Sequence, residues 1–241
     1  MPLYKEQGVV LRAVKLAEAD KIVTILTQGA GKVRAVAKGI RRTQSKFGAR
    51  LEPFTHVSLM LYQGRNLDTV AQAEILTSFR SVREDYARFS AGETMLETAD
   101  RVSEDHEKNV PLFLLLLNGL RALEANPPDP AAVAESFLLK LLSLSGFHPS
   151  LAACASCGSR SIVAFSPVQG GAVCTGCAEH DSIPATPEAL AWLDHLSRED
   201  LARLGPTEVA DQPRREARVM LSTYAEYHME RRIRSLPLLA R

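Results

Sequence analysis

The four cysteines are the residues of this chain whose type and spacing most clearly indicate chemistry. They form two Cys-x-x-Cys pairs, Cys154/Cys157 and Cys174/Cys177, separated by sixteen residues. Each pair forms a tight knuckle that aims two thiolates at one point, and two knuckles supply the four sulfurs of a tetrahedral zinc site. The sequence therefore predicts one structural Zn²⁺ bound by Cys154, Cys157, Cys174 and Cys177.

Three other uses of the cysteines are compatible with the spacing. Two disulfides would suit an exported chain, but no apolar export signal follows Met1. A redox Cys-x-x-Cys motif normally stands alone beside a βαβ unit, and His180 could replace one ligand. Gly158 and Gly176 fit the zinc interpretation, because tight turns need positive φ or close backbone approach. Four thiolates leave no open coordination position, so we expect a structural site rather than a catalytic one.

Composition indicates an ordinary globular protein. The chain has 241 residues, of which 46% are hydrophobic and 24% charged, enough for one large domain or a few small ones. The longest apolar run, residues 112–117, is far too short to cross a bilayer. We therefore expect a cytoplasmic protein with no membrane partner.

The net charge of +1 conceals a segregation of charge along the chain. Residues 1–80 contain 13 Lys and Arg against 6 Asp and Glu, whereas residues 81–153 contain 6 against 11. Residues 154–241 are nearly balanced, with 10 against 11. The pattern predicts a basic N-terminal domain beside an acidic middle.

The N-terminal eighty residues have the pattern of a small β-barrel. β-branched and alternating segments predict five strands, with a turn at 63–66 between the last two. The predicted strands are residues 8–14, 21–27, 32–38, 56–62 and 67–73. Five short strands suggest a closed barrel, and the oligonucleotide-binding (OB) barrel is the common five-stranded form.

One segment of this barrel contains cations and no acidic residue. Between Lys21 and Leu51 there are eight Lys and Arg residues. Such a concentration suits a phosphate backbone, and Phe47 or Tyr62 could stack on a base, although each also suits a packing role. A solvated basic face, or a surface that docks an acidic protein, would look the same. Our predicted DNA-binding residues are Lys32, Arg34, Lys38, Arg41, Arg42, Lys46 and Arg50.

Helical periodicity replaces the β pattern after residue 80. We expect helices over 81–107, from Pro111 onward, over 131–145, over 188–203 with Thr186 as N-cap, and over 214–234. The fold class is thus α+β and multi-domain, with an N-terminal five-stranded barrel, an α-helical domain and an inserted four-cysteine zinc module. The predicted divisions are 1–80 for the barrel, 81–150 and 183–241 for the two parts of the helical domain, and 151–182 for the zinc module.

Arginines in the last predicted helix have two interpretations. Arg231, Arg232 and Arg234 could extend the cationic surface, or they could simply complement the dipole of the helix C-terminus. Motifs of enzymatic sites are missing, since the chain has no Walker A loop, no G-x-G-x-x-G and no H-E-x-x-H. We expect no bond-breaking activity.

Several segments, in order and spacing, resemble the bacterial recombination mediator family RecO over essentially the whole chain. They are residues 8–11 (GVVL), 18–23 (EADKIV), 31–39 (GKVRAVAKG), 51–54 (LEPF), 112–115 (LFLL) and 141–147 (LLSLSGF), together with the four cysteines and Gly170-Gly171. The four-cysteine site is not universal in that family, so the chain resembles its zinc-bearing members.

The resemblance implies a role in DNA repair, recombination and the response to DNA damage. It implies binding of single- and double-stranded DNA and annealing of complementary strands. With the partner RecR, such proteins help to displace single-strand-binding protein and to load RecA, so a nucleoid-associated cytoplasmic location is expected. The rival hypotheses are a zinc-stabilised scaffold whose basic face docks an acidic protein, and a catalytic zinc enzyme.

Overall fold

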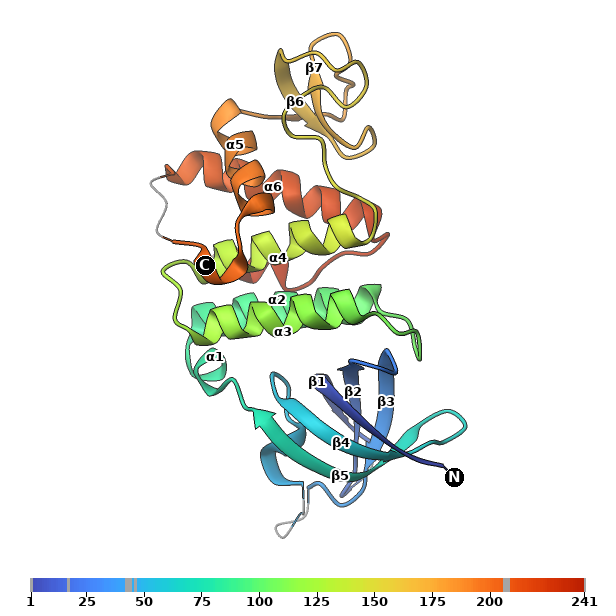
Figure 1. Cartoon of the computed structure of the whole chain (residues 1–241). Coiled ribbons are helices and arrows are strands. Elements are labelled where there is room, and N and C mark those ends of the chain that lie inside the picture. The colour runs from blue at the N-terminus through green and yellow to red at the C-terminus, as the bar shows by residue number, and fades with distance from the viewer. Residues whose placement is uncertain (1, 17, 42–44, 46, 206–208, 241) are drawn as a thin grey trace.

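The molecule is a stack of layers along one long axis (Figure 1). The computed structural model describes residues 2–16, 18–41, 45, 47–205 and 209–240. A β-barrel forms one end, helices form the middle, and the cysteine-bearing module lies at the opposite end (Figure 1).

Five strands close the N-terminal barrel in the order β1-β2-β3-β5-β4. Neighbouring strands are antiparallel except β3 and β5, which pair in parallel. This arrangement confirms the predicted OB barrel. The strands are β1 (Leu3–Lys15), β2 (Lys21–Thr27), β3 (Lys32–Ala37), β4 (His56–Tyr62) and β5 (Asp68–Thr77).

Strand β1 is longer than predicted because it serves two partners. Its first half pairs with β4 and its second half with β2, and Gly8 lies where the two pairings meet. A Cβ atom at Gly8 would lie 2.6 Å from Ile25 Cγ2 and 2.8 Å from the carbonyl oxygen of Leu26. Glycine is therefore required where the strand passes closely over β2.

Alternate side chains of β3 point into the barrel interior. Val33, Ala35 and Ala37 are fully buried, whereas Arg34 and Lys38 are exposed. Side chains alternate between the two faces of a strand, so one face of β3 is apolar and fills the barrel, and the other presents Arg34 to solvent.

In the part of the chain that the structure describes, six α-helices pack between the barrel and the module. They are α1 (Arg80–Glu84), α2 (Tyr86–Val102), α3 (Val110–Glu124), α4 (Pro130–Leu144), α5 (Pro187–Arg198) and α6 (Asp211–His228). Asn109, Asp129 and Thr186 each accept a backbone N–H at a helix start, and a proline lies in the first turn of each of these helices. Three short 3₁₀ segments accompany them: η1 (Gly48–Leu51), η2 (Leu201–Arg203) and η3 (Leu236–Ala240).

Three predicted helix boundaries were wrong. The expected helix over 81–107 is divided at Asp85, whose carboxylate caps α2 by accepting the N–H of Arg88 at 2.9 Å, and α2 ends at Val102. The helix expected over 188–203 ends at Arg198, and η2 follows as a separate turn. The last helix ends at His228, so residues 231–234 lie beyond it.

One continuous core joins the barrel to the helices. Val9, Leu11 and Phe54 from the barrel belong to the same buried cluster as the apolar faces of the helices. Phe54 packs on Phe89 of α2 at a ring-centroid distance of 5.5 Å, and a Cβ atom at Gly92 would lie 2.6 Å from the Phe54 ring. The barrel therefore packs closely on α2.

The cysteine module has a sheet of its own, in the order β7-β6-β8. These strands are β6 (Ile162–Ser166), β7 (Gly171–Cys174) and β8 (Ile183–Pro184). Within the described residues, no helix is sufficiently long and apolar to cross a membrane.

Candidate nucleic-acid interface and metal centre

A row of polar residues crosses three strands on the outside of the barrel. The register pairs Arg12 of β1 with Thr24 of β2, and Thr24 with Arg34 of β3. Residues paired across adjacent strands face the same side, so the two arginines flank Thr24. Both arginines are exposed, whereas Thr24 is 2% exposed beneath them. Barrels of this architecture bind oligonucleotides on the surface of the second and third strands.

A hollow of about 410 Å³ lies on the other side of β3 and is lined by Lys38 and Tyr62 among others. Tyr62 of β4 pairs with Leu3 of β1 and with Thr69 of β5, and these residues also line the hollow. The Tyr62 side chain is 42% exposed, so a base can approach its ring. An aromatic ring beside a cation is the combination that grooves for single strands use.

Of the two aromatic residues considered for base stacking, one is exposed and the other is buried. Tyr62 is accessible, but Phe47 is 1% exposed and belongs to the buried cluster inside the barrel. Of the two roles considered for Phe47, the packing role is confirmed and stacking on a base is not, because its ring is buried inside the barrel.

Lys32 is directed toward the helices rather than toward solvent. Its Nζ donates to the carbonyl oxygen of Asp100 at 2.8 Å and lies 3.4 Å from the Asp100 carboxylate and 4.0 Å from that of Asp105. Its side chain is only 15% exposed. These contacts give Lys32 a role in joining the barrel to α2, and we therefore leave it out of the candidate interface.

The remaining predicted cations continue from the end of β3. Arg41 is exposed and donates from Nη1 to the carbonyl oxygen of Glu18 at 2.8 Å, and Arg50 is exposed in η1. Arg42 and Lys46 lie outside the described residues. The structure thus places Arg34, Lys38, Arg41 and Arg50 on the barrel surface.

The exposed cations of the barrel that were not predicted as DNA-binding residues include Arg12 and Arg65. Arg12 was overlooked because a bulge between Val10 and Arg12 interrupts the alternation of β1. Arg65 lies in the turn between β4 and β5, which the Asp68 carboxylate fixes by accepting the Gly64 N–H at 2.8 Å. The turn predicted at residues 63–66 could have indicated Arg65 as a candidate, because the loop between the fourth and fifth strands contributes to ligand binding in OB barrels.

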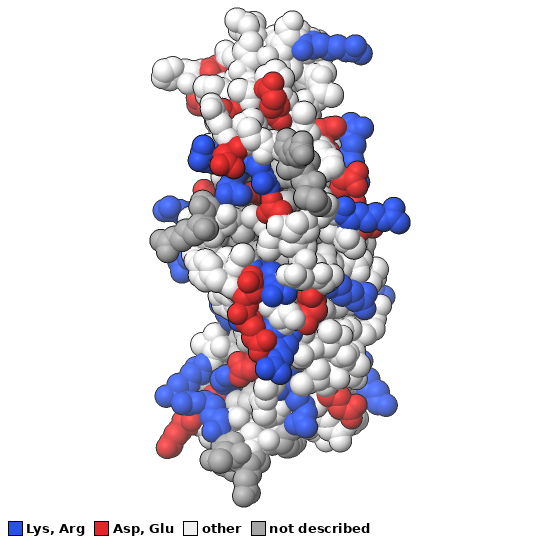
Figure 2. All heavy atoms as spheres, turned by 90° about the vertical axis from the view of Figure 1, so that its left-hand side faces the viewer, with Lys and Arg blue, Asp and Glu red and all other residues white. Residues whose placement is uncertain are grey.

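Acidic and basic side chains are mixed over the helical part of the face shown in Figure 2. The helical acids include Glu97 and Asp100, which are engaged by Arg101 and by Lys32 and Arg12. These two acids of the acidic middle are therefore ion-pair partners within the molecule.

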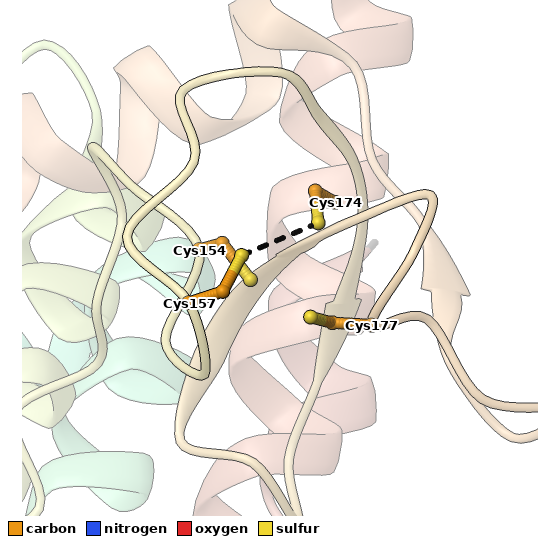
Figure 3. Close-up of side chains that lie close together, drawn as sticks. All are labelled: Cys154, Cys157, Cys174 and Cys177. Carbon is orange, nitrogen blue, oxygen red and sulfur yellow. Dashed lines mark hydrogen bonds between the residues drawn. The ribbon is translucent and has the colours of Figure 1, made fainter.

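The four cysteine sulfurs converge at the far end of the molecule. All four lie within 4.8 Å of one another, and the side chains of the two knuckles approach a common centre (Figure 3). The Sγ atoms of Cys157 and Cys174 are 3.6 Å apart, and all four cysteines are free thiols, so the disulfide alternative is wrong. His180 is exposed and is not part of the cluster.

The two knuckles share one backbone hydrogen bond, from the residue after the second cysteine to the carbonyl of the first. The Gly158 N–H donates to the Cys154 carbonyl at 2.9 Å, and the Ala178 N–H donates to the Cys174 carbonyl at 2.8 Å. Gly158 has a φ of 73°, as predicted. Gly176 has neither a positive φ nor a close neighbour, so the expectation for that glycine is wrong.

The local electrostatics suit a cation. Backbone N–H groups of Cys157 and Cys174 point at the Cys154 sulfur and lower the pKa of that thiol to about 6. Hydrogen bonding with the Cys157 and Cys174 thiols raises the pKa of Cys177 to about 12. Four neighbouring thiolates repel one another, so all four ionise only around a positive ion. The donor set therefore fits a metal held for structural purposes.

The metal centre is separate from the barrel surface. The barrel and the module lie at opposite ends of the stack (Figure 1). The module's own buried cluster contains only Cys154, Ala164, Val173 and Cys174. A module with so small a core depends on a metal for its fold.

Comparison with known proteins gives a consistent result over the whole chain. Residues 1–79 match the family described as Recombination protein O N terminal, and residues 83–237 match Recombination protein O C terminal. A DNA repair protein RecO from a Nocardioides species is 46% identical, covering 99% of this chain and 100% of the relative. Proteins of the same name from Frankia casuarinae and Thermobifida fusca are 44% and 42% identical, each covering 100% of both chains.

Proposed function

The chain belongs to the RecO family of DNA repair proteins, and from that premise we propose that it binds single- and double-stranded DNA through the outer surface of its barrel. The observation that carries the proposal is the position of β3 between two surfaces that suit nucleic acid. Arg34 contributes to the arginine row on one side, and Lys38 borders the Tyr62 hollow on the other. Arg41 and Arg50 extend the cationic surface beyond the strand, and Arg42 and Lys46 remain predicted members.

Binding through this surface is tolerant of base sequence and sensitive to salt. Arginine and lysine side chains contact phosphates, which are the same in every sequence, and their binding releases condensed counterions. Tyr62 adds stacking, which every base can provide. Neutralising the phosphates of two strands reduces their mutual repulsion, and this supports annealing of complementary strands.

Family membership is the basis for the proposed partners. We propose that the protein acts with RecR on DNA covered by single-strand-binding protein and promotes loading of RecA. The protein would then work in the cytoplasm at the nucleoid, as a mediator of recombination without bond-breaking activity.

One Zn²⁺ is the metal we propose for the four cysteines. Tetrahedral four-sulfur coordination is typical of structural zinc, and it leaves no position for a substrate or a reactive water. Cys154, Cys157, Cys174 and Cys177 would hold the ion and so fix the module. This arrangement supports a structural role over the catalytic zinc alternative.

A salt series of DNA binding tests the proposed function. Purified protein is titrated with labelled single- and double-stranded oligonucleotides of unrelated sequences, and annealing of complementary strands is followed in parallel. We expect binding to both forms, a linear fall of log K with log salt, and faster annealing. If the protein did not bind DNA at moderate salt but did bind an acidic protein, the scaffold hypothesis would replace this proposal.

A further inference from the structure

The segment after α6 presents three arginines from a firmly held backbone. The helix ends at His228, and the chain turns at Glu230, which has a φ of 52°. Arg231, Arg232 and Arg234 follow and are exposed. These arginines lie beyond the end of the helix. An interaction with the helix dipole therefore does not explain why three of them are grouped in this segment.

Two carboxylates and an apolar anchor hold this segment in place. Glu226 accepts the N–H of Ile233 at 3.0 Å, and Ile233 is fully buried. Glu97 of α2 accepts the N–H groups of Arg234 at 3.1 Å and Ser235 at 2.8 Å. The guanidinium groups therefore extend from a fixed backbone, which reduces the entropy lost when they bind a ligand.

The three arginines surround a hollow with Arg101. This hollow has a volume of about 550 Å³, and its lining consists of four arginines and Pro237. Arg101 is paired with Glu97, but among the described residues Arg231, Arg232 and Arg234 form no ion pair. A hollow bordered by unpaired guanidinium groups attracts an anion, and the planar guanidinium fork matches phosphate oxygens.

A larger cleft of about 900 Å³ connects this hollow with the barrel. Arg231 and Arg234 line it together with Arg12, the first member of the arginine row on the barrel. Four acidic residues also line the cleft: Asp100 is paired with Arg12 and Lys32, and Glu97 with Arg101, whereas Glu93 and Glu104 form no ion pair among the described residues. Arg12 thus links two cationic surfaces that belong to different domains.

We propose that Arg231, Arg232 and Arg234 form a second phosphate site, which holds the backbone of a nucleic acid strand where it continues past the barrel. This inference rests on the proposed function, because the first part of the strand occupies the barrel. The ligand is a polyphosphate backbone rather than an acidic protein, since the arginines border a continuous path from the barrel and not an isolated patch.

Oligonucleotides of two lengths test the second site. One has about 8 nucleotides, within the length that a single OB barrel covers, and the other has about 40. The variant is Arg231→Gln, Arg232→Gln and Arg234→Gln. The control carries Arg121→Gln, Arg160→Gln and Arg203→Gln, which removes the same charge from exposed positions elsewhere.

For the long oligonucleotide, we expect the salt slope of the variant to flatten by about 2, since single-strand slopes are about −0.7 per phosphate contact. The short oligonucleotide should bind the variant as it binds the wild type, and the control should behave as wild type with both lengths. Should the triple variant unfold, each single glutamine variant is expected to flatten the slope by about 0.7.

Four results would overturn the second site, three of them from the oligonucleotide series. Those three are an unchanged slope on the long oligonucleotide, an equal loss on both lengths, and an equal loss in the control. The proposal would also be overturned if the three arginines were needed for binding polyglutamate but not for binding the long oligonucleotide. Failure of the wild type to bind either oligonucleotide would instead refute the proposed function, so the two failures are distinguishable.

Discussion

Lys32 on β3 and Asp100 on α2 are joined twice: Lys32 Nζ donates to the Asp100 carbonyl at 2.8 Å and lies 3.4 Å from its carboxylate. The backbone strengthens the junction, since the N–H of His106 donates to the Lys32 carbonyl at 2.9 Å. This relationship separates Lys32, which holds the domains together, from Arg34 on the same strand and Lys38 just beyond it, which remain exposed for a ligand.

Replacing Lys32 with methionine should lower stability without altering DNA contacts. The lost charged hydrogen bond should reduce the free energy of unfolding by about 1–2 kcal/mol, measured by chemical denaturation. The salt slope of DNA binding should stay at the wild-type value, whereas Arg34→Gln should flatten it and leave stability nearly unchanged. A Lys32→Met variant with normal stability and a flatter slope would show that Lys32 contacts DNA after all.

Replacing Tyr62 with alanine should weaken single-strand binding through lost stacking. Base stacking on an aromatic ring contributes about 1–3 kcal/mol, so affinity should fall by about fivefold to 150-fold. Tyr62→Phe should retain most of the affinity, and the salt slope should not change in either variant. Tyr86→Ala is the matched control, because Tyr86 is 57% exposed at the start of α2 and does not line the Tyr62 hollow. An equal loss in both alanine variants would argue against a stacking role for Tyr62.

Removal of the metal should unfold the cysteine module and spare the barrel. Chelation, or Cys174→Ser, should make residues 151–182 sensitive to proteases, because the module lacks an adequate core of its own. Binding of a short oligonucleotide at the opposite end of the molecule should persist. Metal analysis of the purified protein should find one zinc ion per chain in the wild type. A resistant module in metal-free protein would contradict the structural assignment.

Acid should weaken the attachment of the C-terminal segment through Glu97. Burial tends to raise the pKa of this carboxyl, but hydrogen bonds from Ser235, Arg101 and the Arg234 N–H outweigh it and lower the pKa below the usual 4.5. A carboxyl whose pKa is lower in the folded state than in the unfolded state stabilises the fold fully at a pH above its unfolded-state pKa. This stabilisation is lost as the pH falls through its folded-state pKa.

Thermal unfolding of the wild type and of Glu97→Gln across a pH series measures this contribution. The wild type should be more stable by a constant margin near neutral pH, and the margin should shrink as the pH falls below about 4.5. A margin that is independent of pH would mean that the charge of Glu97 does not hold the segment.

Local patterns predicted the barrel and the metal centre because their signals lie close together in the sequence. Alternation in β3 separated Ala35 from Arg34 and Lys38, and two Cys-x-x-Cys pairs indicated four sulfurs at one point. Long-range relations were not predictable in this way. Asp100 lies 68 residues from Lys32, and the cross-strand row of Arg12 and Arg34 depends on a bulge that breaks the alternation of β1.

Helix ends were the other limit of prediction. Residues 229–234 retain helix-forming side chains, so the sequence pattern continues past the point where α6 stops. The turn at Glu230 is fixed by tertiary contacts, in particular the burial of Ile233 and the acceptance of its N–H by Glu226. Such contacts from other elements are invisible in a local pattern.

The most direct test of the central claim is the salt dependence of single-strand binding for a variant with Arg34→Gln, Lys38→Gln and Arg41→Gln. If these three residues contact phosphates, the slope of log K against log salt should flatten by about 2 relative to the wild type. The matched control is the variant with Arg121→Gln, Arg160→Gln and Arg203→Gln, which should keep the wild-type slope. An unchanged slope and affinity in the barrel variant, with its fold intact, would contradict the assignment of the barrel surface as the DNA interface.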